Sequence, residues 1–233
     1  MKKILFFDID GTIARRGEGI EADLLDLLDD LSYRYEVVLI TGNTAEYVIG
    51  MMRQANKLKN IAIICESGGL IYDSPVLPTS KIYEHTNIEN ANNTFCNAIN
   101  NMKNGCKERV IKIATSETSM TFIFGNETDL KKSFNLLKNN NKNKRYTIYR
   151  HTITIDILNN EVNKGFGVLK YLNIKGYDRN KVFIHTFGDG VNDIPMFMIA
   201  NKVTIVGDIK YKEVCDRLDS VGDMVSFLTN EYK

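Results

Sequence analysis

The sequence predicts an α/β fold: a Rossmann-like parallel sheet with helices, interrupted by a smaller inserted α+β unit. Three observations favour this class. Short apolar runs recur along the chain, helical patterns lie between several of them, and the middle of the chain changes to paired strands. Continuous apolar runs of this length are typical of strands buried on both faces. Their alternation with helices indicates parallel strands joined by right-handed crossovers.

The elements of the parallel sheet can be placed in order along the chain. Strands are expected at residues 4–7, 36–40, 61–65, 181–185 and 203–206. Helices are expected at residues 20–35, 44–58 and 165–173. In the first helix one face at helical spacing consists of Ile20, Leu24, Leu27, Leu28 and Leu31. Between the third and fourth of these strands, from about residue 80 to 158, the pattern differs.

The order of helices and paired strands in this middle segment indicates an inserted unit. The expected order is helix 89–103, strands 109–115 and 119–125, helix 127–139, and strands 145–150 and 152–158. The turn "SETS" between the first two strands is typical of an antiparallel hairpin. We therefore expect a core domain of residues 1–79 and 159–233, and an inserted α/β cap, or lid, of residues 80–158.

Composition and charge exclude several classes of partner. The chain has 233 residues and a formal net charge of +1, so no global field attracts nucleic acid or a membrane. No apolar run reaches the roughly 18 residues of a membrane span. The run after Lys2 and Lys3 stops at Asp8, too early for a signal peptide. We expect a cytoplasmic protein; the sequence leaves its oligomeric state open.

Small, polar or acidic residues follow four of the predicted strands. These groups are Asp8-Ile9-Asp10-Gly11-Thr12, Thr41-Gly42-Asn43, Glu66-Ser67-Gly68-Gly69 and Gly188-Asp189-Gly190-Val191-Asn192-Asp193. Turn chemistry alone explains the second and third groups, because loops are rich in such residues. It does not explain the first and last together. Since parallel strands end at one edge of a sheet, where ligands bind, we expect a site there.

The residue types at this edge point to phosphate chemistry. Gathered carboxylates repel one another and need a cation, and all-oxygen ligands suit Mg²⁺. Asp8 can then serve as a nucleophile that forms an aspartyl-phosphate, with Asp10 as general acid and base. Gly11 permits a sharp turn. Lys164 is a candidate to balance the phosphate charge, although a solvated surface lysine is an equally good interpretation from spacing alone.

At this point the chain resembles the haloacid dehalogenase superfamily of phosphatases. The resemblance rests on "DIDGT" at 8–12, Thr41 in "LITGN", Lys164 in "NKGFG" and "GDGVND" at 188–193. It extends over nearly the whole chain, because the insertion lies between the second and third motifs, as in members with an α/β cap. "TGN" together with "ESGG" looks most like the archaeal phosphoglycolate phosphatase and Cof or sucrose-phosphatase-like group.

The resemblance implies a role for each matched residue. Asp8 would be nucleophile and metal ligand, and Asp10 would be acid/base with its carbonyl on the metal. Thr41 would bind the transferring phosphoryl group within a substrate-binding set completed by Gly42, Asn43, Lys164 and Asn192. Asp189 would bind Mg²⁺, and Asp193 would do so directly or through water. One departure is Gly207-Asp208, where the family often has Asn-Ala.

The sequence thus favours a Mg²⁺-dependent phosphatase of a small phosphorylated metabolite, such as phosphoglycolate or a sugar phosphate. One alternative is a phosphomannomutase-like phosphotransferase, which shares the first motif and a similar cap. Another is a non-catalytic binding protein on the same scaffold, because a fold does not imply a function. The presence of both Asp8 and Asp10 argues against the latter.

Overall fold

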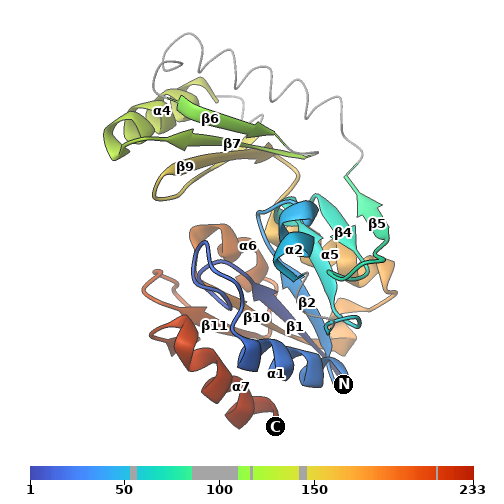
Figure 1. Cartoon of the computed structure of the whole chain (residues 1–233). Helices are drawn as coiled ribbons and strands as arrows, with labels where there is room; N and C mark the ends of the chain where they lie inside the picture. The colour runs from blue at the N-terminus through green and yellow to red at the C-terminus, as the bar shows by residue number, and fades with distance from the viewer. Residues whose placement is uncertain (53–56, 86–109, 116–117, 142–145, 214) are drawn as a thin grey trace. The chain divides into compact units, whose positions relative to one another are not determined.

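The chain folds into two compact units. The computed structural model describes residues 1–52, 57–85, 110–115, 118–141, 146–213 and 215–233 (Figure 1). One unit comprises Met1–Glu84 and Lys164–Lys233, and the other comprises His85–Asn163. The helix expected at 89–103 lies outside the described residues, as does part of the helix expected at 44–58.

The larger unit is built on an eight-stranded sheet in the order β12-β11-β10-β1-β2-β3-β4-β5. Its strands are β1 Lys2–Asp8, β2 Glu36–Ile40, β3 Ala62–Cys65, β4 Leu70–Tyr72, β5 Lys81–Glu84, β10 Val182–Gly188, β11 Lys202–Val206 and β12 Asp216–Leu218. All pairs from β12 to β3 are parallel, whereas β4 and β5 add an antiparallel edge. The predicted fold class is confirmed, and the five predicted strands are all present.

Helices cover both faces of this sheet. The helices are α1 Ala22–Ser32, α2 Ala45–Met51, α5 Lys164–Ile174, α6 Ile194–Phe197 and α7 Met224–Tyr232. Leu5 and Phe7 of β1 pack into the core that contains α1 and α7. Ile4 and Phe6 point to the opposite face, toward α5 and α6. This alternation is the two-residue period of a strand, and it explains why Ile4 to Phe7 of β1 are all apolar.

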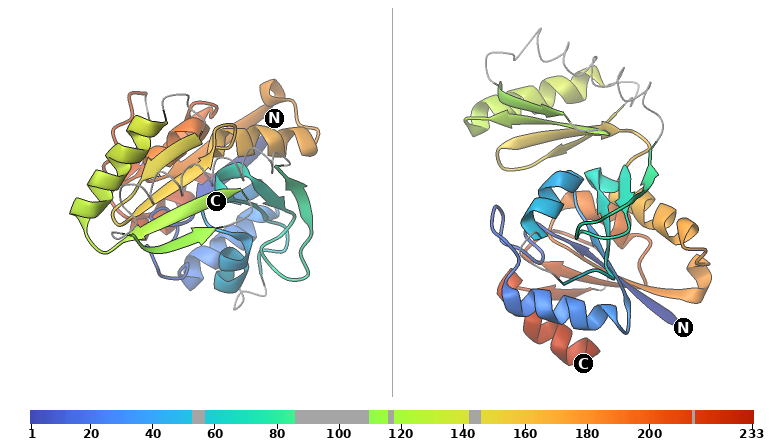
Figure 2. Two further views of the ribbon diagram at one scale, coloured as in Figure 1. Left: turned by 90° about the horizontal axis from the view of Figure 1, so that it is seen from above. Right: turned by 45° about the vertical axis from the view of Figure 1, so that its right-hand side comes forward.

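The smaller unit contains a four-stranded antiparallel sheet, and helix α4 lies on one face of it (Figure 2). Its strands are β6 Val110–Thr115, β7 Ser119–Phe124, β8 Tyr146–Arg150 and β9 Thr154–Asn159, in the order β6-β7-β9-β8. Helix α4, Glu127–Asn140, begins at Asn126, whose side chain accepts the Asp129 N–H. Leu130 and Leu137 of α4 pack in one core with Phe122 of β7. Both hairpins expected from the sequence are present.

Candidate active site

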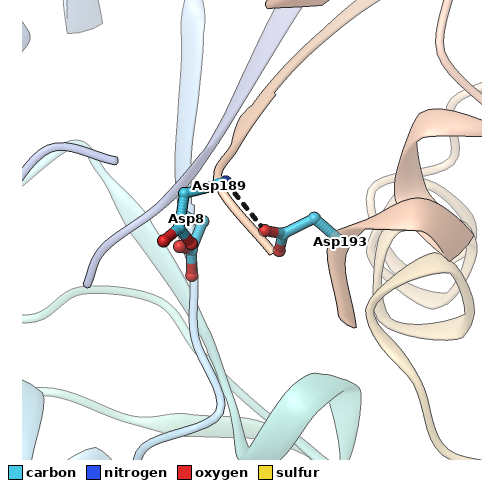
Figure 3. Close-up of side chains that lie close together, drawn as sticks. All are labelled: Asp8, Asp189 and Asp193. Atoms are coloured by element: carbon cyan, nitrogen blue, oxygen red, sulfur yellow. Dashed lines mark hydrogen bonds between the residues drawn. The ribbon is translucent and has the colours of Figure 1, made fainter. Parts of the chain in front are cut away.

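Three carboxylates meet where β1 and β10 end. These neighbouring parallel strands run in register from Lys2 opposite Val182 to Phe7 opposite Phe187, so the residues that follow them emerge together. One oxygen each of Asp8, Asp189 and Asp193 lies within 4.8 Å of the others. Figure 3 shows Asp8 and Asp189 side by side, with Asp193 directed toward them. We call these three residues the carboxylate cluster.

A glycine permits this close approach. Gly11 has a φ of +93°, which favours glycine, and a Cβ there would lie 2.1 Å from Oδ2 of Asp189. Gly188 plays a similar part beside Asp193, since its Cβ would lie 2.7 Å from that carboxyl carbon. Gly11 therefore leaves room for an acidic side chain from the exit of β10, and Gly188 leaves room for one from its own loop.

Lys164 lies within the cluster, wholly buried at the start of α5. Its Nζ donates hydrogen bonds to Oδ1 of Asp8 and to Oδ1 of Asp193, both at 2.5 Å. Burial by itself lowers the pKa of Lys164, but the charges of Asp193 and Asp8 outweigh it and raise that pKa above the ordinary value. The interpretation of Lys164 as a solvated surface lysine is excluded by its burial.

Asp193 holds its own loop together. Its Oδ2 accepts the backbone N–H of Asp189 at 3.0 Å and that of Gly190 at 2.8 Å, while Oδ1 accepts from Lys164 (Figure 3). A carboxylate that accepts several such bonds is fixed in position. Asp193 thereby orients both Lys164 and the backbone that carries Asp189.

Asp10 stands apart from the carboxylate cluster. Its side chain accepts a hydrogen bond from Nδ2 of Asn43 at 2.5 Å. Burial and the charge of Asp8 raise the pKa of Asp10, against the opposing effects of Asn43 and Lys164. A carboxyl group with a raised pKa is suited to giving and taking a proton. Asp8, in contrast, is held on both oxygens, since Thr12 donates to its Oδ2 at 3.0 Å.

Backbone hydrogen bonds connect the loops that follow β2 and β3. The Glu66 N–H donates to the Asn43 carbonyl at 2.9 Å, and the Ser67 N–H donates to the Thr41 carbonyl at 2.8 Å. Glu66 and Ser67 both have positive φ, 50° and 56°, a strained conformation for residues other than glycine. Thr41 is buried and accepts the Asn43 N–H at its Oγ1. The "ESGG" turn therefore fixes the position of the "TGN" loop.

The structure brings some of the predicted site residues together and leaves others apart. It gathers Asp8, Lys164, Asp189 and Asp193, and it links Asp10 to Asn43. Gly42 is exposed and Asn192 is half-buried, in a short 3₁₀ turn at Val191–Asp193.

Sequence reasoning assigned no role to two residues that touch the site. Thr12 is bonded to Asp8, and its place four residues after Asp8 in the quoted motif was the available signal. Arg16 donates from Nη2 to Oδ2 of Asp189 at 2.8 Å, and the sequence carries no signal for this contact, which joins residues 173 positions apart.

Fold and site together define a class: an open α/β protein whose sheet edge gathers carboxylates around a buried lysine. A family model described as haloacid dehalogenase-like hydrolase matches residues 76–216, more than half of the chain. The chain belongs to the haloacid dehalogenase-like hydrolases, and the family expected from the motifs is confirmed.

Individual relatives agree with this assignment. A curated phosphoglycolate phosphatase of Picrophilus torridus is 24% identical over 212 residues, covering 91% of this chain and 82% of the relative. A solved Thermoplasma acidophilum structure matches with a TM-score of 0.73 at 17% identity, covering 99% of this chain and 98% of the other. The C-terminal domain of a C. albicans trehalose-6-phosphate phosphatase has the same TM-score at 15% identity, covering 98% and 91%. At these identities the solved structures show the shared fold.

Proposed function

We propose that this hydrolase is a Mg²⁺-dependent phosphatase of a small phosphorylated metabolite. The observation that carries the proposal is the position of Asp8: it ends β1, lies 5% exposed, and is paired with the buried ammonium group of Lys164. A carboxylate held in this way is a positioned nucleophile, and a cation beside it offsets the charge of an arriving phosphate dianion.

The reaction would proceed in two steps, transfer of the phosphoryl group to Asp8 and hydrolysis of the aspartyl-phosphate. A carboxylate oxygen of Asp8 attacks phosphorus, and the ester P–O bond breaks as Asp10 gives its proton to the departing alkoxide. Asp10 then takes a proton from water, whose oxygen attacks the phosphorus of the aspartyl-phosphate; the Asp8 O–P bond breaks, which frees inorganic phosphate and restores the Asp8 carboxylate. The raised pKa of Asp10 supports its role as the acid in the first step. Thr41, Gly42, Asn43, Lys164 and Asn192 would bind the phosphoryl group.

The donor atoms of the carboxylate cluster fit Mg²⁺. Asp8, Asp189 and Asp193 offer only carboxylate oxygens, within 4.8 Å of one another. Hard oxygen donors of this kind suit Mg²⁺ rather than zinc or copper. Asp8 and Asp189 would hold the ion, with the Asp10 carbonyl, and Asp193 would do so directly or through water. When bound, Mg²⁺ would neutralise charge on the phosphoryl oxygens.

Residues 80–158 are proposed to act as a lid that selects the leaving group. The supporting observation is the chain connection: the unit His85–Asn163 is followed directly by Lys164, a residue of the site. A lid favours compact substrates, and phosphoglycolate is our first candidate because of the family resemblance. Replacing residues 85–163 by a Gly/Ser linker should reduce discrimination among small esters. Unchanged selectivity would assign specificity to the core.

Location and partners follow from the same proposal. None of the helices in the described part of the chain has the length and apolar character needed to span a bilayer. A small phosphorylated metabolite as the partner, rather than nucleic acid or a membrane, and a cytoplasmic location both remain predictions from the sequence.

The test is phosphate release from a panel of a few dozen phosphate monoesters, with Mg²⁺ and with EDTA. Release that requires Mg²⁺ is the expected result. Conversion of a hexose 1-phosphate to its 6-phosphate without release of phosphate would instead support the phosphotransferase alternative. If no ester in the panel were hydrolysed by the folded protein with Mg²⁺, the non-catalytic alternative would be preferred.

A further inference from the structure

The loop that follows the first motif brings a second cation to the site. Residues 15–19 are exposed, while the bridge between Ala14 and Ile20, both buried, closes the ends of this loop. We call it the Arg16 loop. The loop contacts the acidic residues that follow β1 and β10. Arg16 donates a hydrogen bond to Asp189, and the backbone N–H of Gly17 interacts with the Asp10 carboxylate.

This placement brings the Arg16 loop beside Asp10, the residue that would protonate the leaving group. In the proposed mechanism Asp10 must reach the ester oxygen in order to protonate it. Since the backbone N–H of Gly17 contacts that same carboxylate, the departing alcohol would, in this mechanism, leave beside the residue that precedes Gly17, which is Arg16.

Arg16 retains the capacity to bind an anion. Its side chain is 55% exposed, and in the described part of the chain its one hydrogen bond runs from Nη2 to Asp189. The other cation that acts on these carboxylates, Lys164, is wholly buried and shared between Asp8 and Asp193. A guanidinium presents five N–H groups in a fork that matches a carboxylate.

We infer that Arg16 is a specificity residue that binds a carboxylate on the leaving group, so that the substrate is a small phosphate monoester carrying a carboxylate close to its ester oxygen. This inference rests on the proposed function and adds the chemical class of the leaving group. The short distance along the chain between Arg16 and Gly17 limits how far the carboxylate can be from the ester. Loss of a charge-assisted hydrogen bond of this kind costs about ten- to a hundredfold in affinity.

The experiment compares two esters of nearly equal size: 2-phosphoglycolate and 2-hydroxyethyl phosphate, which has a hydroxymethyl group in place of the carboxylate. The full-length protein and three variants, Arg16→Ala, Arg16→Lys and Arg15→Ala, are assayed with Mg²⁺. Arg15 is the matched control, because it is equally exposed but pairs with Glu18 and Glu21. The quantity measured is the ratio of kcat/KM for the two esters.

We expect the wild-type protein to favour 2-phosphoglycolate, Arg16→Ala to lower that ratio about ten- to a hundredfold, and Arg16→Lys to restore part of it. Arg15→Ala should leave the ratio unchanged. A wild-type ratio near one, an unchanged ratio in Arg16→Ala, or an equal loss on both esters would overturn the inference, the last by showing that Arg16 acts only through Asp189. In each of these cases Mg²⁺-dependent hydrolysis by the wild type would leave the proposed function standing. Absence of hydrolysis of either ester, and of an activated aryl phosphate, would overturn both.

Discussion

Lys164 Nζ donates a hydrogen bond to Asp8 Oδ1 at 2.5 Å although 156 positions separate the two residues. The contact joins the strand that begins the chain to the helix that follows the inserted unit. Both side chains are buried, Lys164 completely, so neither charge can be solvated by water instead. Stability and chemistry at this site are therefore coupled: removing the charge of Lys164 leaves Asp8 and Asp193 in the core without their cation, whereas removing that of Asp8 leaves Lys164 paired with Asp193.

Lys164→Met should destabilise the protein by about 3–5 kcal/mol, because it leaves Asp8 and Asp193 buried without their cation. Urea unfolding of the larger unit measures this cost. The matched control is Lys181→Met, at a side chain that is 83% exposed. Combining Lys164→Met with Asp193→Asn should recover part of the loss. A cost for Lys164→Met as small as that of Lys181→Met would contradict the buried pair.

Asp8→Asn should abolish turnover while the protein still folds, since an amide cannot act as the nucleophile. The expected fall in kcat is about a thousandfold or more. Asp208→Asn is the control, because Asp208 is an exposed aspartate just beyond the end of β11. Protein should be assayed fresh and checked by mass spectrometry for deamidation back to aspartate. Activity close to wild type in such a sample would rule out Asp8 as the nucleophile.

Gly11→Ala and Gly176→Ala separate crowding from backbone strain. Both glycines have positive φ, +93° and +69°, and either substitution should cost about 1–2 kcal/mol from the backbone alone. A Cβ at Gly11 would also lie 2.1 Å from Asp189 Oδ2, whereas a Cβ at Gly176 meets no atom within 4 Å. Gly11→Ala should therefore be the more destabilising and should weaken Mg²⁺ binding, measured by calorimetry. Equal costs and equal Mg²⁺ affinity would show that Asp189 can move aside freely.

Removal of metal by EDTA should abolish activity, and added Mg²⁺ should restore it. Binding can also be followed without activity: Mg²⁺ at a hundred times its Kd should stabilise the folded protein by about 2.7 kcal/mol. Asp189→Asn should reduce this shift. Ca²⁺ should inhibit, because it prefers more and longer oxygen ligands and can engage both oxygens of Asp8. Full activity in excess EDTA would refute the metal requirement.

His185 should contribute a loss of stability of the larger unit between pH 7 and pH 5.5. This side chain is fully buried, and burial, with the charges of Lys202 and Lys3, lowers its pKa to about 3. The folded protein therefore keeps His185 neutral while the unfolded chain, with a pKa near 6.5, takes up a proton as the pH falls. The loss over this range is about 1 kcal/mol.

The matched variant for this pH effect is His185→Gln, which can still bond to Tyr232 and Thr204, the two partners of the imidazole. It should remove this part of the pH dependence, as measured by urea unfolding at both pH values. If wild type and variant lost the same stability between pH 7 and pH 5.5, the assignment to His185 would be wrong.

Much of the fold could be predicted because the strands of the larger sheet are buried on both faces. The buried part of such a strand must be apolar, as Ile4 to Phe7 of β1 and Val37 to Ile40 of β2 show, so these runs are visible without any long-range information. Strands β4 and β12 were missed because each has only three residues, too few for a pattern. Helix α7 was missed too: it has nine residues, of which Met224, Leu228 and Tyr232 are buried in the core that contains α1.

In the candidate site, too, features set by local sequence patterns were predictable, and features set by long-range packing were not. The sequence by itself determined that Asp8, Asp10, Asp189 and Asp193 follow strands and belong to one edge, because parallel strands end together. Only the tertiary structure decided that Lys164 is buried between Asp8 and Asp193, that Asp10 faces Asn43, and that Arg16 reaches Asp189. The periodicity of a strand is a local property, because it depends only on residues that are adjacent in the sequence. Which charges become partners is set by packing between segments far apart in the chain, where burial makes an unpaired charge too costly to leave.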